Sequence, residues 1–126
     1  MDSPSHTVLV VDDDPSIRFL CRVNLELDGW TVRDAATMEA ARAELAEAHV
    51  DVVLLDVHVG AESGVDLLGE IRRDYPGLPV AMLTGSVGSP TLDGVTTDAV
   101  IAKPFAPEQL TQTVAHLASR AAPHAG

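Results

Sequence analysis

The sequence has little of what secreted and membrane-spanning proteins require. Its 126 residues include one cysteine, so no disulfide can form within the chain, and a lone thiol fits a reducing compartment. No run reaches the roughly 18 apolar residues of a transmembrane helix. The opening residues MDSPSHT lack the basic and apolar stretches of a signal peptide. We therefore expect a cytoplasmic protein that does not enter the membrane.

Positive charge is scarce as well. Lysine and arginine number 8 against 19 aspartate and glutamate residues, which gives a formal net charge of −11. Such a surface repels nucleic-acid phosphates, so we expect no direct nucleic acid binding by this domain. The apolar fraction of 46% is nevertheless typical of globular proteins, and the length suits one domain. We place that domain at residues 6–120, between loose termini at 1–5 and 121–126.

Strand and helix patterns alternate regularly along the chain. Five apolar runs bounded by turn residues predict strands at 7–11, 30–33, 50–55, 79–83 and 99–102. An amphipathic helix pattern follows the first, second, third and fifth of these runs. Residues 85–97 contain three glycines and a proline, which favour a short or frayed helix. This alternation predicts an α/β fold with a parallel sheet between two helical layers.

The first helix has the clearest boundaries. Asp14 and Pro15 suit an N-cap and a first helical position, and Gly29 suits the residue after the helix ends. Thr37 is predicted to cap the second helix. The predicted buried stripes of the helices are Ile17, Leu20, Cys21, Asn24 and Leu27; Met38, Ala41, Leu45 and Ala48; Leu67, Leu68, Ile71 and Tyr75; and Leu110, Val114, Leu117 and Ala121.

Polar residues close four of the five predicted strands. Asp12 and Asp13 follow the first strand, Asp56 the third, Thr84 the fourth and Lys103 the fifth. In an open parallel sheet, ligands bind at the edge formed by the carboxyl ends of the strands. Three carboxylates held together there need a cation to remain ionised, and Mg²⁺ with oxygen ligands is the simple solution. With a lysine and a hydroxyl added, the set suits a phosphoryl group.

The segments LVVDDDP, VVLLD and AKPF, with a threonine closing the fourth strand, resemble the receiver domain of bacterial two-component response regulators. This resemblance covers residues 6–120. It implies a three-layer, flavodoxin-like, doubly wound five-stranded parallel sheet in the order 2-1-3-4-5. It also implies transfer of a phosphoryl group from a histidine kinase or a histidine phosphotransfer protein to an aspartate, with Mg²⁺ or Mn²⁺. The resulting conformational change would modulate a protein partner or an output domain.

Carried over residue by residue, the resemblance makes Asp56 the phosphoacceptor. Asp13 would bind the metal directly, Asp12 partly through water, and His58 through its backbone carbonyl. Lys103 would pair with the Asp56 carboxylate and then with the phosphoryl oxygens. Such a domain promotes only its own phosphorylation and dephosphorylation, so we expect that it is not an enzyme acting on an external metabolite.

Other positions relate to switching. Thr84 would hydrogen-bond the phosphoryl group and move toward it, which is how the family starts its conformational change. Ser86 and the His58 side chain lie where the family tunes hydrolysis of the phosphoaspartate. Three residues before the lysine, the family usually has an aromatic switch residue, and this chain has Val100. We therefore expect output through backbone or loop shifts.

Two more features depart from the family pattern. Gly60 stands where a proline usually follows the acceptor, which predicts a looser loop over residues 57–60. Lys103 follows Thr84 by 19 residues (103 − 84), fewer than is usual. This interval predicts a shortened fourth helix and an altered version of the face that relatives use to dimerise.

Two other functions compete with the phosphoacceptor. Residues 12–16, DDDPS, also fit the D-x-D-x-[ST] motif of haloacid-dehalogenase-like phosphatases, with Asp12 as nucleophile and Asp14 as acid/base. Those enzymes need a second acidic pair, and Glu108 is the only acidic residue after Lys103. The other alternative is a phosphorylation-independent protein-interaction receiver. Val100 and the shortened helix favour it, whereas the presence of every expected site residue argues against it.

Overall fold

Five parallel strands form the centre of the computed structural model, which describes residues 6–85 and 97–121. The elements run in the order β1 (Thr7–Val11), α1 (Pro15–Leu27), β2 (Thr31–Ala35), α2 (Met38–Glu47), β3 (Val52–Asp56), β4 (His58–Val59), β5 (Glu62–Ser63), α3 (Gly64–Asp74), β6 (Val80–Thr84), β7 (Ala99–Ala102) and α4 (Pro107–Ala121). Strands β4 and β5 form a separate small hairpin. Within the described residues, no helix has the length and apolar character needed to span a membrane.

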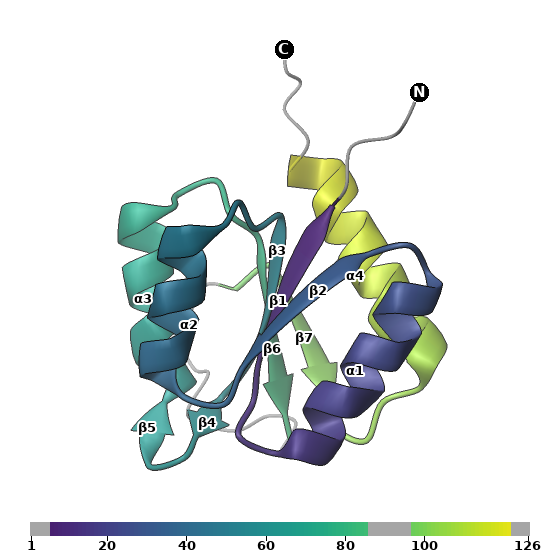
Figure 1. Cartoon of the computed structure of the whole chain (residues 1–126), viewed down its shortest axis with the longest axis horizontal. Coiled ribbons are helices and arrows are strands. Elements are labelled where there is room, and N and C mark those ends of the chain that lie inside the picture. Colours follow the sequence, from purple (N-terminus) through teal and green to yellow (C-terminus); the bar gives the residue numbers. More distant parts are fainter. Residues whose placement is uncertain (1–5, 86–96, 122–126) are drawn as a thin grey trace.

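The five strands of the main sheet pair in the order β2-β1-β3-β6-β7, all in parallel. Since β6 and β7 are the fourth and fifth of the predicted strands, the predicted order 2-1-3-4-5 is confirmed. Helices α2 and α3 cover one face of the sheet, and α1 and α4 cover the other (Figure 1). The architecture is the predicted three-layer, doubly wound α/β fold.

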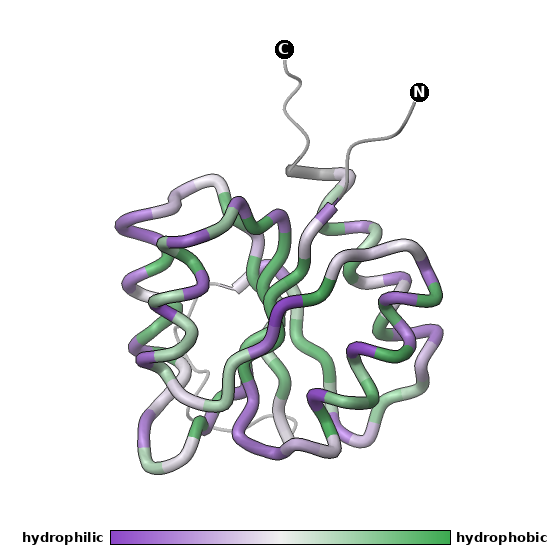
Figure 2. The backbone as a smooth tube through the Cα atoms, in the orientation of Figure 1, coloured by the Kyte–Doolittle hydropathy of each residue, from purple (hydrophilic) through white to green (hydrophobic). Residues whose placement is uncertain are grey.

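The alternation of side chains along each strand explains how the sheet is buried on both faces. In β1, Leu9 and Val11 pack with α2 and α3, whereas Val8 and Val10 pack with α1 and α4. All four are completely buried, and burial of one such side chain contributes about 1.5–3 kcal/mol. Figure 2 shows hydrophobic residues along the central strands. The position of the strand ends is therefore set by the core.

Helix α1 begins and ends where the sequence predicts. The Asp14 side chain accepts a hydrogen bond from the Ser16 backbone N–H at 2.8 Å, and Pro15 occupies the first turn. After the helix, Gly29 adopts a φ of +94°, a conformation that glycine enters without steric cost. The helix therefore starts directly after the acidic residues that follow β1.

The predicted buried face of α1 is partly wrong. Leu27 is 82% exposed and Leu20 is 37% exposed, whereas Cys21 and Leu25 are completely buried. An α-helix has 3.6 residues per turn, so residues four apart lie on nearly the same side of it. In α1 the residues Ile17, Cys21 and Leu25 form such a row, and this row packs against the sheet. The buried face is thus rotated toward Leu25, and Leu20 and Leu27 lie to one side of it.

The other predicted helical stripes need smaller corrections. Tyr75, predicted on the buried stripe of α3, is the C-cap residue and is 37% exposed. The loop that Gly60 was expected to loosen forms the β4–β5 hairpin, with Gly60 at a φ of +61° in its turn. The stripes of α2 and α4 are buried as predicted at Met38, Ala41, Leu45, Leu110, Val114 and Leu117.

Three predictions concern residues outside the described ranges. They are the shortened fourth helix, which would lie within residues 86–96, the role of Ser86, and the loose termini at 1–5 and 122–126. The predicted boundary also assigned Ala121 to the loose C-terminus, but Ala121 is the last residue of α4.

Candidate functional site

The order of the strands brings the polar strand ends together. Strands β1 and β6 flank β3, and β7 lies next to β6. Asp12 directly follows β1, Asp56 ends β3, Thr84 ends β6, and Lys103 directly follows β7. Because the neighbouring strands end at nearly the same register, these residues share the carboxyl edge of the sheet, where ligands bind in folds of this kind.

Asp12, Asp13 and Asp56 form an acidic cluster at this edge. One carboxylate oxygen from each residue lies within 4.8 Å of one from each of the others. Asp12 is completely buried, Asp56 is 9% exposed, and Asp13 is exposed. Oxygen ligands at this spacing, one of them open to solvent, fit a hard divalent cation that keeps part of its water shell. The acidic cluster is therefore able to bind a metal ion.

Lys103 is the only lysine of the chain, and it faces the acidic cluster. Its Nζ lies 2.7 Å from Asp12 Oδ2 and 3.5 Å from Asp56 Oδ1. Burial by itself would lower the pKa of Lys103, but the two carboxylates outweigh burial, so the net pKa is raised above its usual value. Lys103 therefore stays charged and balances part of the negative charge of the cluster.

Asp56 lies in surroundings that disfavour its charge. Burial, followed by the nearby charge of Asp12, raises the pKa of Asp56. The charge of Lys103 and a hydrogen bond from the His58 backbone N–H oppose this rise without cancelling it. A bound cation would act in the same direction as Lys103, because positive charge favours the ionised carboxylate. The balance between the ionised and protonated forms of Asp56 therefore depends on these neighbours.

Backbone groups hold the acidic cluster in place. Asp12 Oδ1 accepts a hydrogen bond from the Asp14 N–H at 2.9 Å, which orders the turn between β1 and α1. Asp13 Oδ2 accepts one from the Gly60 N–H at 3.2 Å. The second bond ties the β4–β5 hairpin to the loop after β1, so Gly60 links two parts of the site.

Sequence reasoning missed two residues of this edge. Arg18 donates a hydrogen bond from Nη1 to the Asp12 backbone carbonyl at 2.8 Å. Arg18 follows the cap residue Asp14 by four residues, so both lie on the same side of α1, near the end of β1. This spacing could have identified Arg18 from the sequence. Gly64 donates from its N–H to the Val57 carbonyl at 2.6 Å, directly beside the end of β3.

Three of the remaining predicted residues lie within the described part of the chain. Thr84 is 3% exposed, and its backbone carbonyl accepts a hydrogen bond from the Lys103 N–H at 2.8 Å. His58, in β4, has an exposed side chain. Val100, in β7, is 46% exposed. Ser86 lies outside the part of the chain that the structure describes.

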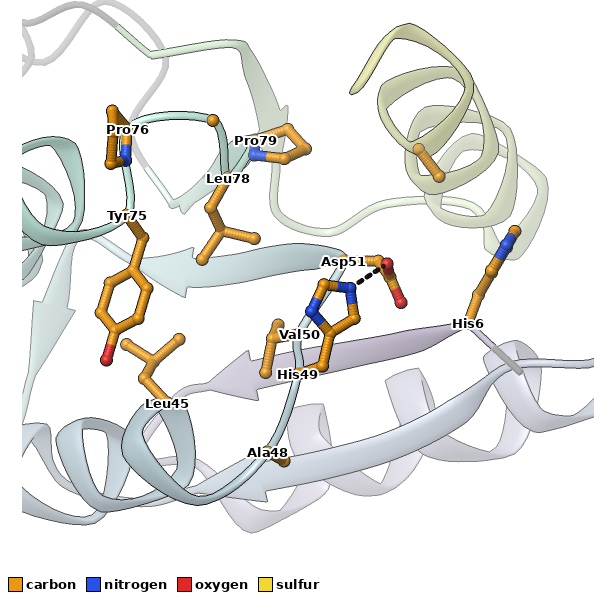
Figure 3. A pocket seen from close by; sticks show the side chains of 12 residues that line it. His6, Leu45, Ala48, His49, Val50, Asp51, Tyr75, Pro76, Leu78 and Pro79 are labelled. Carbon is orange, nitrogen blue, oxygen red and sulfur yellow. Dashed lines mark hydrogen bonds and ion pairs between the residues drawn. The ribbon is translucent and has the colours of Figure 1, made fainter. Parts of the chain in front are cut away.

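A cavity of about 480 Å³ lies at the opposite edge of the sheet (Figure 3). Its apolar lining includes Leu45 and Leu78. Its carboxylate, Asp51, already has partners: Oδ2 accepts a hydrogen bond from the Thr7 N–H at 2.7 Å, and Oδ1 lies 3.0 Å from His49 Nε2. The cavity contains none of the predicted site residues.

Comparisons with known proteins extend over most of the chain. A sequence profile of the response regulator receiver domain matches residues 8–115. TcrX of Mycobacterium tuberculosis, a probable transcriptional regulatory protein, is 36% identical over 112 residues, which cover 86% of this chain and 48% of TcrX. The transcriptional regulatory protein ResD of Bacillus subtilis is 34% identical over 125 residues, which cover 96% of this chain and 52% of ResD. The chain thus spans about half the length of these two relatives.

Solved structures resemble the whole fold. A CheY-like response regulator receiver domain protein from Methanospirillum hungatei has a TM-score of 0.87 at 26% identity, covering 94% of this chain and 97% of that one. The chemotaxis response regulator CheY4 of Vibrio cholerae has a TM-score of 0.82 at 31% identity, covering 90% of this chain and 99% of CheY4. The similarity therefore extends over nearly the whole chain.

Proposed function

The chain belongs to the response regulator receiver domain family, and from that premise we propose that it is a phosphoacceptor of two-component signalling. In this proposal Asp56 receives a phosphoryl group from a histidine kinase or a histidine phosphotransfer protein. The observation that carries the proposal is the position of Asp56 beside Asp12, Asp13 and Lys103 at one edge of the sheet. Each of these neighbours has a physical role in the transfer.

The proposed step is a displacement at phosphorus. A carboxylate oxygen of Asp56 supplies the electron pair of the new O–P bond, and the ring nitrogen of the donor histidine leaves with the electron pair of the broken P–N bond. The product is an acyl phosphate on Asp56. Lys103, with its Nζ 3.5 Å from Asp56 Oδ1, is close enough to offset charge on the phosphoryl oxygens.

We propose Mg²⁺ or Mn²⁺ as the cation of the acidic cluster. Asp13 and Asp56 would bind it directly, Asp12 partly through water, and His58 through its backbone carbonyl. Both oxygens of Asp12 already accept hydrogen bonds, which suits an indirect role, and the exposure of Asp13 leaves space for water ligands. When bound, the cation would neutralise carboxylate charge and attract the phosphoryl oxygens.

Thr84 would begin the conformational change. It is buried at the end of β6, the neighbour of β3, and we propose that its hydroxyl moves toward a phosphoryl group on Asp56. Val100 replaces an aromatic switch residue, so the change would pass through backbone and loop shifts. Ser86 and the His58 side chain would tune the lifetime of the phosphoaspartate.

The signal would leave through protein contacts. TcrX and ResD are transcriptional regulators of which this chain spans about half. We propose that the receiver, placed at residues 6–120, modulates an output domain or a separate protein partner. Its net charge of −11 disfavours direct contact with nucleic acid, and we propose a cytoplasmic location. The domain would change its own phosphorylation state and would not turn over an external metabolite.

The two alternatives have less support. A haloacid-dehalogenase-like mechanism needs Asp12 as nucleophile and Asp14 as acid/base. Asp12 is completely buried and bonded to Lys103, and the Asp14 side chain caps α1. A phosphorylation-independent interaction receiver is favoured by Val100, but it does not account for the placement of Lys103 against two carboxylates.

Intact-protein mass spectrometry after incubation with Mg²⁺ and acetyl phosphate tests the proposal. We expect the wild type to gain one phosphoryl group. Asp56→Asn should gain none, because a carboxamide is not a nucleophile of this kind. Reduction of the acyl phosphate with borohydride, followed by peptide mapping, should place the modification at residue 56.

Asp14→Asn is the matched control, because Asp14 adjoins the acidic cluster in sequence but has an exposed side chain that caps α1. It should be phosphorylated like the wild type. No gain in the wild type would favour the interaction receiver. Phosphorylation that survives Asp56→Asn but is lost in Asp12→Asn would favour the phosphatase-type mechanism.

A further inference from the structure

Gly64, the first residue of α3, packs against the backbone of Asp56 more closely than a side chain would allow. An ideal Cβ built on Gly64 would lie 2.0 Å from the Asp56 carbonyl oxygen, 3.1 Å from the Asp56 carbonyl carbon and 3.2 Å from the Val57 carbonyl oxygen. The first distance is far below van der Waals contact, which begins at about 3.5 Å. Any larger L-residue must therefore displace backbone next to the proposed phosphoacceptor.

The other described glycines lack this contact. A Cβ on Gly69, Gly77 or Gly85 would meet nothing within 4 Å. The same holds for Gly29 and Gly60, where positive φ values of +94° and +61° are the reason for glycine. Among the described glycines, the one at the start of α3 is therefore required for steric reasons, and the atom it must accommodate belongs to Asp56.

Hydrogen bonds and packing hold both sides of this contact. The Gly64 N–H donates to the Val57 carbonyl at 2.6 Å, and the Val57 N–H donates to the Leu83 carbonyl of β6 at 3.0 Å. The two hydrogen bonds thus hold Val57, the residue that follows Asp56, between α3 and β6. Helix α3 is itself fixed in the core by Leu67, which is 1% exposed.

We propose that Gly64 is a positioning residue of the phosphoacceptor site, an inference that rests on the proposed function of Asp56. Its missing side chain lets α3 begin against the Asp56 carbonyl, and this contact sets the orientation of the peptide and carboxylate of Asp56. A methyl group at residue 64 would meet backbone atoms, which cannot yield as a flexible side chain does. Since α3 and β6 are both held by the core, the Asp56–Val57 peptide would tilt and carry the carboxylate away from Lys103.

Gly64→Ala and Gly69→Ala form a matched pair, because each adds one methyl group to α3 and only residue 64 contacts Asp56. The folded fraction is measured by far-UV circular dichroism. Intact-protein mass spectrometry then gives the phosphorylation rate per folded molecule at saturating Mg²⁺ and saturating acetyl phosphate. A misplacement of about 1 Å can reduce a reaction rate by about 100-fold. We expect a fall of about tenfold or more in Gly64→Ala and a change within about twofold in Gly69→Ala.

A packing role alone would lower the stability of Gly64→Ala and leave its rate per folded molecule unchanged, and that result would overturn the proposal. If Gly64→Ala is unfolded in buffer, both variants are measured in trimethylamine N-oxide, which favours the folded state. Failure to refold there would assign Gly64 to folding and not to positioning, which also overturns the proposal. If the wild type and Gly69→Ala are not phosphorylated either, the phosphoacceptor function itself is refuted, and the positioning role with it.

Discussion

The two edges of the sheet both contain carboxylates, but they differ in charge balance. At the carboxyl edge, the three carboxylates of the acidic cluster face the one ammonium group of Lys103, and burial raises the pKa of Asp56. At the amino edge, Asp51 has a backbone N–H on one oxygen and His49 on the other. The amino edge has the cavity of about 480 Å³, yet its carboxylate needs no further partner. Here the imbalance of charge, and not the size of a cavity, identifies the edge that suits a ligand.

The largest expected loss of unfolding free energy comes from removing the charge of Lys103 at the carboxyl edge. In Lys103→Met, Asp12 stays completely buried without its ion pair, and breaking a buried pair in this way costs about 3 kcal/mol of unfolding free energy. Mg²⁺ should restore part of the loss, because a cation can replace the missing charge. Urea unfolding with EDTA and with Mg²⁺ measures both effects.

Arg42→Met is the matched control, since it breaks the pair with Glu70 on the surface between α2 and α3. The Arg42 side chain is 46% exposed, so we expect a loss well below that of Lys103→Met and no recovery with Mg²⁺. A loss in Lys103→Met no larger than this would contradict the difference between a buried site pair and a surface pair.

Neutralising Asp56 at the carboxyl edge is expected to raise the unfolding free energy, by less than Lys103→Met lowers it. Because the pKa of Asp56 is raised in the folded state, the folded chain binds this proton more tightly than the unfolded chain does. Stability is then lost as pH rises from the unfolded pKa through the folded pKa. Asp56→Asn should therefore be more stable than the wild type near neutral pH in EDTA. The gain should shrink as pH falls toward the usual aspartate pKa.

Urea unfolding of Asp56→Asn and the wild type at about pH 7 and about pH 4.5 measures this difference. Asp51→Asn provides the comparison at the amino edge. Its amide keeps an oxygen for the Thr7 N–H but removes the carboxylate that contacts His49, so it should not gain stability at neutral pH. Equal gains in both variants would remove the distinction between the two edges.

The smallest change in unfolding free energy is expected from replacing His49, the side-chain partner of Asp51 at the amino edge. The His49 side chain is 86% exposed, and exposed pairs contribute little because water screens them. His49→Gln should change the unfolding free energy by about 0.5 kcal/mol or less and leave the phosphorylation rate unchanged. A loss as large as that of Lys103→Met would show that the amino edge also depends on a buried charge pair.

The location of the site could be predicted from the sequence because it depends on where strands end. Asp12, Asp56 and Lys103 each follow an apolar run, and the sheet order is restricted by right-handed crossovers. The side-chain partners could not be predicted. That Lys103 lies closer to Asp12 than to Asp56 depends on how far each strand end projects beyond its neighbour.

The buried face of α1 and the contact of Gly64 could not be predicted from the sequence pattern either. Leu20 and Leu25 both fit an amphipathic helix, and the rotation of α1 that buries only Leu25 is set by its packing against the sheet. At Gly64, the sequence shows a glycine at a helix start, where many residues are allowed. Its contact with the Asp56 carbonyl arises only when α3 folds back onto the end of β3.

The single lysine has a practical consequence for chemical modification of the chain. A protein with many lysines is acylated at many surface positions. This chain has one lysine side chain, that of Lys103. Its ammonium group is held against Asp12 and Asp56, with 21% of the side chain exposed. Acetylation at this residue would remove the ammonium group that pairs with both Asp12 and Asp56.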